Sequence, residues 1–76
     1  MSPKLPVVSG ENLIRALKKL GYEAVRQKGS HVRLYPPANS DRKPTTVPLH
    51  DELAKKTLKQ ILRDADLTVE KLIELL

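Results

Sequence analysis

The sequence predicts an α+β fold: one small domain in the order α-β-β-β-α, with an extra short helix at its C-terminal end. Two segments with apolar residues at helical spacing enclose three short segments of strand character. Residues 30–35 alternate cleanly between apolar and polar side chains, which indicates a strand with one buried face. We therefore expect a three-stranded antiparallel sheet with helices on one face and the other face open.

The first helix is expected over about residues 10–20. Ser9 is a suitable N-cap, and Glu11 lies in the first turn, where the helix dipole favours a negative charge. Val8 is placed to pack on Leu13 as a hydrophobic staple. Gly21 provides a left-handed C-terminal stop. The apolar stripe of this helix consists of Leu13, Ile14, Leu17 and Leu20.

Three strands should follow. Residues 22–27 form the first, Lys28 and Gly29 form the turn, and residues 30–35 form the second. A polar loop rich in turn formers, residues 36–44, leads to a third strand over residues 45–49. Because a proline cannot donate to the hydrogen-bond ladder, Pro48 should end this strand or place it at an edge of the sheet.

The rest of the chain is expected to be helical. The second helix has an apolar stripe with basic residues around it, and the stripe consists of Leu58, Ile61, Leu62 and Ala65. Thr68 should cap a short last helix, with Leu67 placed to staple onto Leu72. The last residues are too apolar for a free tail, so we expect Leu72, Ile73, Leu75 and Leu76 to dock on the body or on a partner.

The 76 residues are enough for one domain, which we assign to residues 1–76. The absence of cysteine excludes disulfides and thiolate zinc sites and is compatible with a reducing compartment. The N-terminal residues 1–6 lack the long apolar stretch of a signal peptide, and no segment approaches a membrane span. We therefore expect a cytoplasmic protein without a membrane partner.

Charge is distributed unevenly along the chain. Residues 1–63 carry a balance of +8, whereas residues 64–76 carry −3, for a net charge of +5. A basic body with an acidic end is typical of a protein with a polyanionic partner. The alternative is that the excess lysine only keeps a small protein in solution, and charge alone favours neither interpretation.

The predicted open face carries the candidate functional residues. Val32 and Leu34 point to the core, so the alternate side chains of the strand are displayed to solvent together. Histidine can exchange protons near neutral pH, and RNA cleavage can use the RNA's own 2′-hydroxyl as nucleophile. An ordinary exposed histidine is the more frequent case by composition alone. The candidates are His31 as acid/base group, Arg33, Lys28 and Arg26 as phosphate-binding groups, and Tyr35 as a stacking group.

His50 is the second histidine. It follows the third strand and precedes the second helix, so it either faces the same groove or caps that helix, and we favour the structural role. Its spacing from His31 is not that of a metal-ligand pair. We expect no metal and no small-molecule cofactor.

Several motifs, in order and over nearly the whole chain, resemble the HicA family of toxin components. They are Ser9-Gly10, residues 17–22 (LKKLGY), residues 27–31 (QKGSH), residues 47–50 (VPLH), residues 56–62 (KTLKQIL) and residues 65–68 (ADLT). The resemblance implies a fold like the double-stranded-RNA-binding domain, a ribonuclease that cleaves messenger RNA and arrests translation, and a cognate HicB antitoxin. The family's functional histidine, in Gly-Ser-His, corresponds to His31, and Gly29 to the turn residue that exposes it.

Two positions depart from the family pattern, since Lys56 and Asp66 stand where members commonly have glycine. Asp tolerates a left-handed conformation better than most residues, so the second departure is mild. The sequence thus predicts a toxin that is a metal-independent endoribonuclease, with mRNA and a HicB-like antitoxin as partners. Two alternatives remain at this stage: a non-catalytic RNA-binding module of the same fold, and a protein-interaction domain whose basic face binds an acidic protein.

Overall fold

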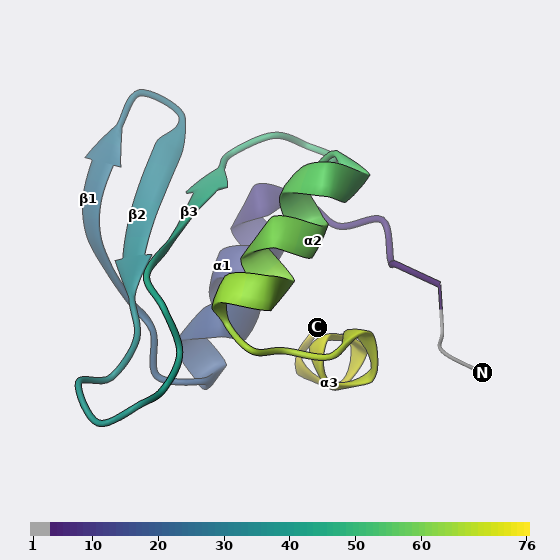
Figure 1. Ribbon diagram of the computed structural model, residues 1–76. Helices are drawn as coiled ribbons and strands as arrows, with labels where there is room; N and C mark the ends of the chain where they lie inside the picture. Colours follow the sequence, from purple (N-terminus) through teal and green to yellow (C-terminus); the bar gives the residue numbers. More distant parts are fainter. Residues whose placement is uncertain (1–3) are drawn as a thin grey trace.

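The computed structural model describes residues 4–76; the first three residues of the N-terminal segment considered above for a signal peptide lie outside this range. The predicted order of helices and strands is confirmed, with the sheet in one layer and the helices in a second (Figure 1). The elements are α1 (Gly10–Lys19), β1 (Glu23–Lys28), β2 (His31–Tyr35), β3 (Thr45–Pro48), α2 (Lys55–Asp64) and α3 (Val69–Leu75).

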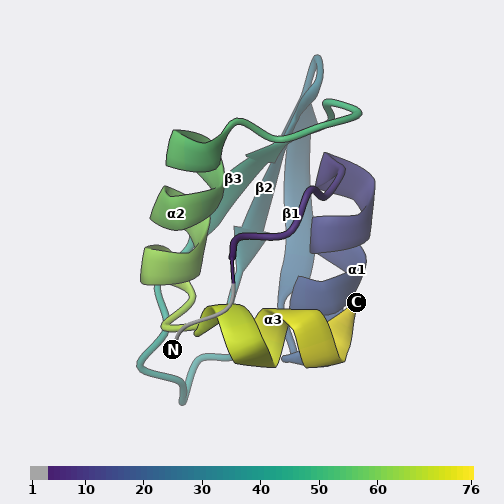
Figure 2. The same ribbon diagram turned by 90° about the vertical axis from the view of Figure 1, so that its right-hand side faces the viewer.

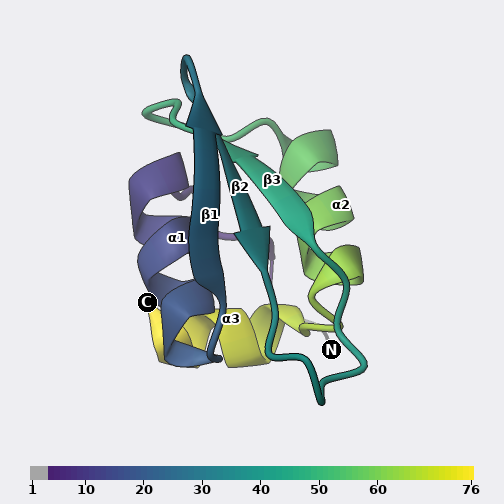
Figure 3. The ribbon, with the colours of Figure 1, turned by 90° about the vertical axis from the view of Figure 1, so that its left-hand side faces the viewer.

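The three strands form an antiparallel sheet in the order β1-β2-β3, so β2 is central and β1 and β3 are edges. Val32 and Leu34 are buried, whereas His31 and Tyr35 are exposed, which confirms the predicted facing of the second strand. The helices cover only the Val32 side, and the opposite side of the sheet is uncovered (Figure 3). A strand shifted by one residue would have reversed these positions.

Strand limits differ slightly from the prediction. The third strand is an edge of the sheet and ends at Pro48, as expected because proline has no N–H to donate. The next residue, Leu49, still donates its N–H to the Ser30 carbonyl at 2.6 Å. The first strand begins at Glu23 rather than at Tyr22. Tyr22 is instead a core residue, whose hydroxyl donates to the Lys43 carbonyl at 2.7 Å.

The core lies between the sheet and the helices, and aliphatic side chains fill it. Its fully buried large side chains are Leu13, Leu17, Leu34, Leu58, Ile61, Leu72, Val47 and Thr45. Tyr22 is the only aromatic residue among the buried residues of the described chain. Burial raises the pKa of Tyr22, with the nearby Asp64 carboxylate acting in the same direction and Arg42 opposing it.

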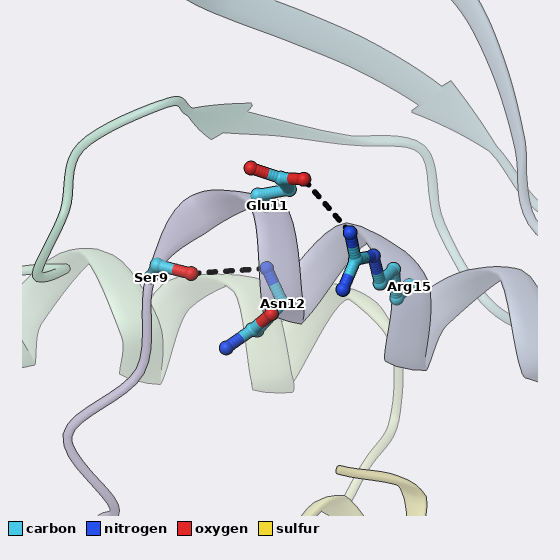
Figure 4. Close-up of polar contacts among 4 residues, drawn as sticks. All are labelled: Ser9, Glu11, Asn12 and Arg15. Atoms are coloured by element: carbon cyan, nitrogen blue, oxygen red, sulfur yellow. Dashed lines mark hydrogen bonds and ion pairs between the residues drawn. The ribbon is translucent and has the colours of Figure 1, made fainter.

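The N-cap and the first turn of α1 match the prediction (Figure 4). The Ser9 hydroxyl accepts from the Asn12 N–H at 3.1 Å, which satisfies one of the free donors of the first turn. Glu11 lies in that turn and forms an exposed ion pair with Arg15 at 2.9 Å, one helical turn later. Gly21 follows the helix with φ +96°, the left-handed conformation expected of the C-terminal stop.

The C-terminal helices close the far side of the core, with α3 lying across the ends of α1 and α2 (Figure 2). The Thr68 hydroxyl caps α3 by accepting from the Lys71 N–H at 3.1 Å, as predicted. Leu72 is fully buried and Leu75 is half-buried, so both dock on the body. Ile73 and Leu76 are only partly covered by the body, since 46% and 48% of their respective surfaces remain exposed.

The two positions that depart from the family pattern are accommodated differently. Lys56 lies within a regular first turn of α2. Asp66, between α2 and α3, has φ +50° and is the only non-glycine residue with positive φ among those described. It therefore adopts the left-handed conformation for which glycine is usually selected. Among residues 4–76, no helix is long and apolar enough to cross a membrane.

Candidate functional site

Strand register places the basic side chains of β1 beside the histidine and the arginine of β2. Lys28 pairs with His31, and Arg26 pairs with Arg33. Directly opposed residues in an antiparallel pair project from the same face. The uncovered face therefore carries two cross-strand rows, which continue to β3 as Lys28–His31–Pro48 and Arg26–Arg33–Thr46.

A two-residue turn sets the position of His31. Gly29 has φ +59°, a left-handed backbone conformation that favours glycine. A Cβ at this position would meet no atom within 4 Å, so the backbone conformation, and not a lack of space, favours glycine here. The turn ends at Ser30, and His31 is the first residue of β2, with its side chain exposed. The Gln27 side chain donates to the Gly29 carbonyl at 3.2 Å and braces the turn. His31 is thus presented at the end of the sheet beside Lys28.

A β-bulge brings an additional residue, Val25, to this face. Ala24 pairs with Leu34 and Arg26 pairs with Arg33, so Val25 has no partner in β2. Bulges redirect side chains locally, and 53% of the Val25 surface is exposed. The sequence contained no signal for this bulge, because Val25 is an ordinary apolar residue of a short, mixed strand.

Arg33 is held in place by two neighbours. Its Nη1 donates to the Thr46 Oγ1 at 3.0 Å, and its Cζ lies 5.5 Å from the centroid of the Tyr35 ring. The second distance is within the range of a cation–π contact. The guanidinium is half-buried and retains donors that these two contacts do not use. It is therefore a positioned cation rather than a freely moving one.

These side chains line one concavity of about 520 Å³ on the uncovered face. It brings together all five residues singled out from the sequence and adds two that sequence reasoning missed. Its lining consists of Val25, Arg26, Lys28, His31, Arg33, Tyr35 and Thr46. Thr46 could have been found only from strand register, because nothing in its own sequence context distinguishes it.

The cations of this concavity are not neutralised by acidic side chains. The ion pairs found within residues 4–76 join Glu11 to Arg15 and Lys71 to Glu74, away from this face. Glu23 is the nearest acid in the register, opposite Tyr35 at the other end of the strands. The end of the face that carries His31 therefore offers positive charge to an anionic ligand.

His50 lies outside the concavity. Its side chain is exposed in the connection between β3 and α2, and its carbonyl accepts from the Gly10 N–H at 2.9 Å. It does not cap α2, whose N-cap is Ala54. Within the part of the chain described, no three histidine, cysteine, aspartate or glutamate side chains gather in a way that could hold a metal ion.

Comparison with known families gives one match that covers most of the chain. The model described as "HicA toxin of bacterial toxin-antitoxin" matches residues 10–67, from the first residue of α1 to the residue before the cap of α3. The matched part includes the hairpin that carries His31 and the whole sheet. No curated protein matches the chain significantly. The chain belongs to the HicA family, the toxins of bacterial toxin–antitoxin systems.

Proposed function

We propose that this toxin is an endoribonuclease that cleaves mRNA in the cytoplasm and thereby arrests translation, with His31 as general acid/base. The observation that carries the proposal is the shared concavity, in which an exposed histidine lies among three cations without acidic partners. Family membership supports the same function, because it makes the chain a toxin.

The reaction requires little beyond these groups. The RNA 2′-oxygen attacks the adjacent phosphorus, the P–O5′ bond breaks, and the products end in a 2′,3′-cyclic phosphate and a 5′-hydroxyl. The 2′-hydroxyl loses a proton and the 5′-oxygen gains one, and His31 transfers one of these protons while water transfers the other. The nucleophile belongs to the substrate, so the proposed mechanism needs neither a covalent enzyme intermediate nor a metal.

The other side chains of the concavity have distinct proposed roles. Arg33 is preorganised by Thr46 and Tyr35, so its free donors can stabilise the charge that develops on the phosphate oxygens. Lys28 lies beside His31 in the register and binds the same or the next phosphate. Arg26 contributes further positive charge, and the exposed face of the Tyr35 ring accepts a stacked base.

A HicB-like antitoxin is the proposed protein partner. The same cations that bind RNA would attract acidic side chains, so an antitoxin with an acidic surface can cover the concavity and exclude the substrate. We therefore expect complex formation to become slower and weaker as ionic strength rises. A complex whose affinity and association rate ignore salt would contradict a shared surface.

The decisive variant is His31→Ala. A positioned acid/base group contributes ~10²- to 10⁴-fold in rate, so we expect cleavage of an RNA oligonucleotide to fall by that factor. Because His31 is exposed, the thermal stability and the affinity for uncleavable 2′-O-methyl RNA should change little. The variant should also cease to arrest growth when it is expressed without antitoxin.

His50→Ala is the matched control, since this histidine is also exposed but lies outside the concavity. It should retain cleavage within a few-fold of the wild type. Cleavage by His31→Ala at the wild-type rate would show that this histidine is not the catalyst. RNA binding without any cleavage by the wild-type protein would instead identify a non-catalytic RNA-binding module.

A further inference from the structure

A second concavity adjoins the first at the β3 edge of the sheet. It measures about 430 Å³ and lies between β3 and α2. Arg33 and Thr46 line both concavities, so the two meet at this hydrogen-bonded pair. The remaining lining residues of the second concavity are Thr45, Lys56, Thr57, Gln60, Ile61 and Asp64.

We propose that the RNA strand leaves the His31 site across β3 and continues onto α2, where Lys56 binds its phosphate backbone. This inference rests on the proposed function and deepens it, because it assigns the substrate's path and a binding residue outside the concavity of His31. Two features of the fold make such a path possible. β3 is an edge strand of only four residues, and α2 lies beside it when the uncovered face is viewed directly (Figure 3).

The charges along α2 favour a polyanion at the Lys56 end of the second concavity. Lys56 is exposed and takes no part in the ion pairs described for residues 4–76. Lys55 and Lys59 lie within one turn of it, and the first turn of α2 contains no acidic residue. A phosphate at this end therefore meets positive charge without a competing carboxylate in that turn.

The acidic residue of the second concavity lies at the other end of α2 and is already engaged. The Asp64 carboxylate accepts from the Thr45 hydroxyl at 3.2 Å and from the Gln60 side chain at 3.1 Å. Asp64 is the last residue of α2, whereas Lys56 is the second. The proposed path runs from Arg33 past Thr46 to Lys56, so it leaves the concavity at the end of α2 opposite to the carboxylate.

The alternative path along the sheet is less favourable. Toward the far end of β1 and β2, the residue opposite Tyr35 is Glu23, which is exposed and acidic. A strand continuing in that direction would bring a phosphate toward a carboxylate, which costs free energy. The path across β3 instead passes from the Arg33 guanidinium to the Lys56 ammonium, and both ends attract phosphate.

The test compares short and long RNA on the full chain. An uncleavable 2′-O-methyl dinucleotide can occupy the His31 concavity alone, whereas a dodecanucleotide can also reach α2. Lys56→Ala should weaken dodecanucleotide binding roughly three- to tenfold and leave dinucleotide binding unchanged. The salt dependence of dodecanucleotide binding should fall by ~0.7 log units per log unit of salt, the value for one single-strand phosphate contact. Lys56→Glu should weaken binding further.

Lys18→Ala is the matched control, because it removes one exposed positive charge from α1, which lies on the β1 side when the uncovered face is viewed, whereas α2 lies on the β3 side (Figure 3). It should affect both oligonucleotides far less than Lys56→Ala. Equal effects of the two substitutions, with cleavage still dependent on His31, would overturn the path and leave the proposed function intact. Failure of the wild-type protein to bind or cleave RNA of either length would overturn both.

Discussion

Replacing Gly10 by alanine should destabilise this protein strongly, although alanine is the better helix former. Gly10 is the first residue of α1, is buried, and donates its N–H to the His50 carbonyl at 2.9 Å. A Cβ at this position would overlap the Pro48 carbonyl oxygen and lie 2.9 Å from the Pro48 carbonyl carbon and 3.1 Å from the Leu49 Cα. All three are backbone atoms, so no side-chain rotation can relieve the collision.

The size of the effect follows from two opposing contributions. Helix propensity favours alanine over glycine by at most ~1 kcal/mol, and less at the end of a helix. Overpacking costs about 1–3 kcal/mol even where side chains can adjust, and here α1 must move away from the connection after β3. With the steric cost at the upper end of this range, we expect a net loss of about 2 kcal/mol in the free energy of unfolding. For a domain of this size, such a loss lowers the Tm by about 8–16 °C.

Denaturant and thermal unfolding measure this loss directly. Gly29→Ala is the control, because a Cβ there meets no atom within 4 Å and only the φ of +59° opposes it. That control should lose roughly 1–2 kcal/mol, the usual cost of a left-handed conformation for a residue other than glycine. If Gly10→Ala proves as stable as the wild type, the close approach of α1 to the β3–α2 connection is wrong.

Three further predictions concern single interactions. Thr46→Val keeps the shape of the side chain but removes the Oγ1 acceptor of Arg33, so it should lower the cleavage rate several-fold while the Tm changes by a few degrees at most. Burial raises the pKa of Tyr22 in the folded state. The stability that this shift contributes is present below pH ~10, the pKa of an unfolded tyrosine, and is lost as pH rises through the higher folded-state pKa. Between about pH 8 and pH 11, the free energy of unfolding should therefore fall less in Tyr22→Phe than in the wild type. Asp66→Gly should raise the free energy of unfolding by ~0.5–1 kcal/mol because it relieves the φ of +50°, and a lower Tm for this variant than for the wild type would contradict that reasoning.

The sequence was sufficient to predict the layers of the fold and the side chains on its open face. Apolar and polar side chains alternate strictly over residues 30–35, so a strand that buries Val32 and Leu34 must place His31 on the opposite face. Local signals were equally direct at the helix ends, where Ser9 and Thr68 cap α1 and α3 through the expected hydrogen bonds. Periodicity and helix capping depend on residues that are close in sequence, so they can be predicted from one amino-acid sequence.

Features that depend on strand register could not be predicted in this way. The bulge at Val25 shifts the pairing of β1 with β2, so that Ala24 lies opposite Leu34 and Glu23 lies opposite Tyr35. The contact of Thr46 with Arg33 joins residues 13 positions apart, across two strands. The neighbours of Tyr22 in the sequence predict a strand, whereas its hydroxyl bonds to the Lys43 carbonyl, far along the chain. Long-range pairing of this kind leaves no periodic trace in the sequence.

The order of the elements along the chain determines when the concavity can form during protein synthesis. Six of its seven lining residues belong to the hairpin of β1 and β2, which the ribosome completes before it begins α2 and α3. An isolated two-stranded hairpin is at best marginally stable in water. Its core-facing side needs Leu58, Ile61 and Leu72, which are supplied by the helices made last. A nascent chain therefore carries the side chains of the concavity long before it can hold them in place.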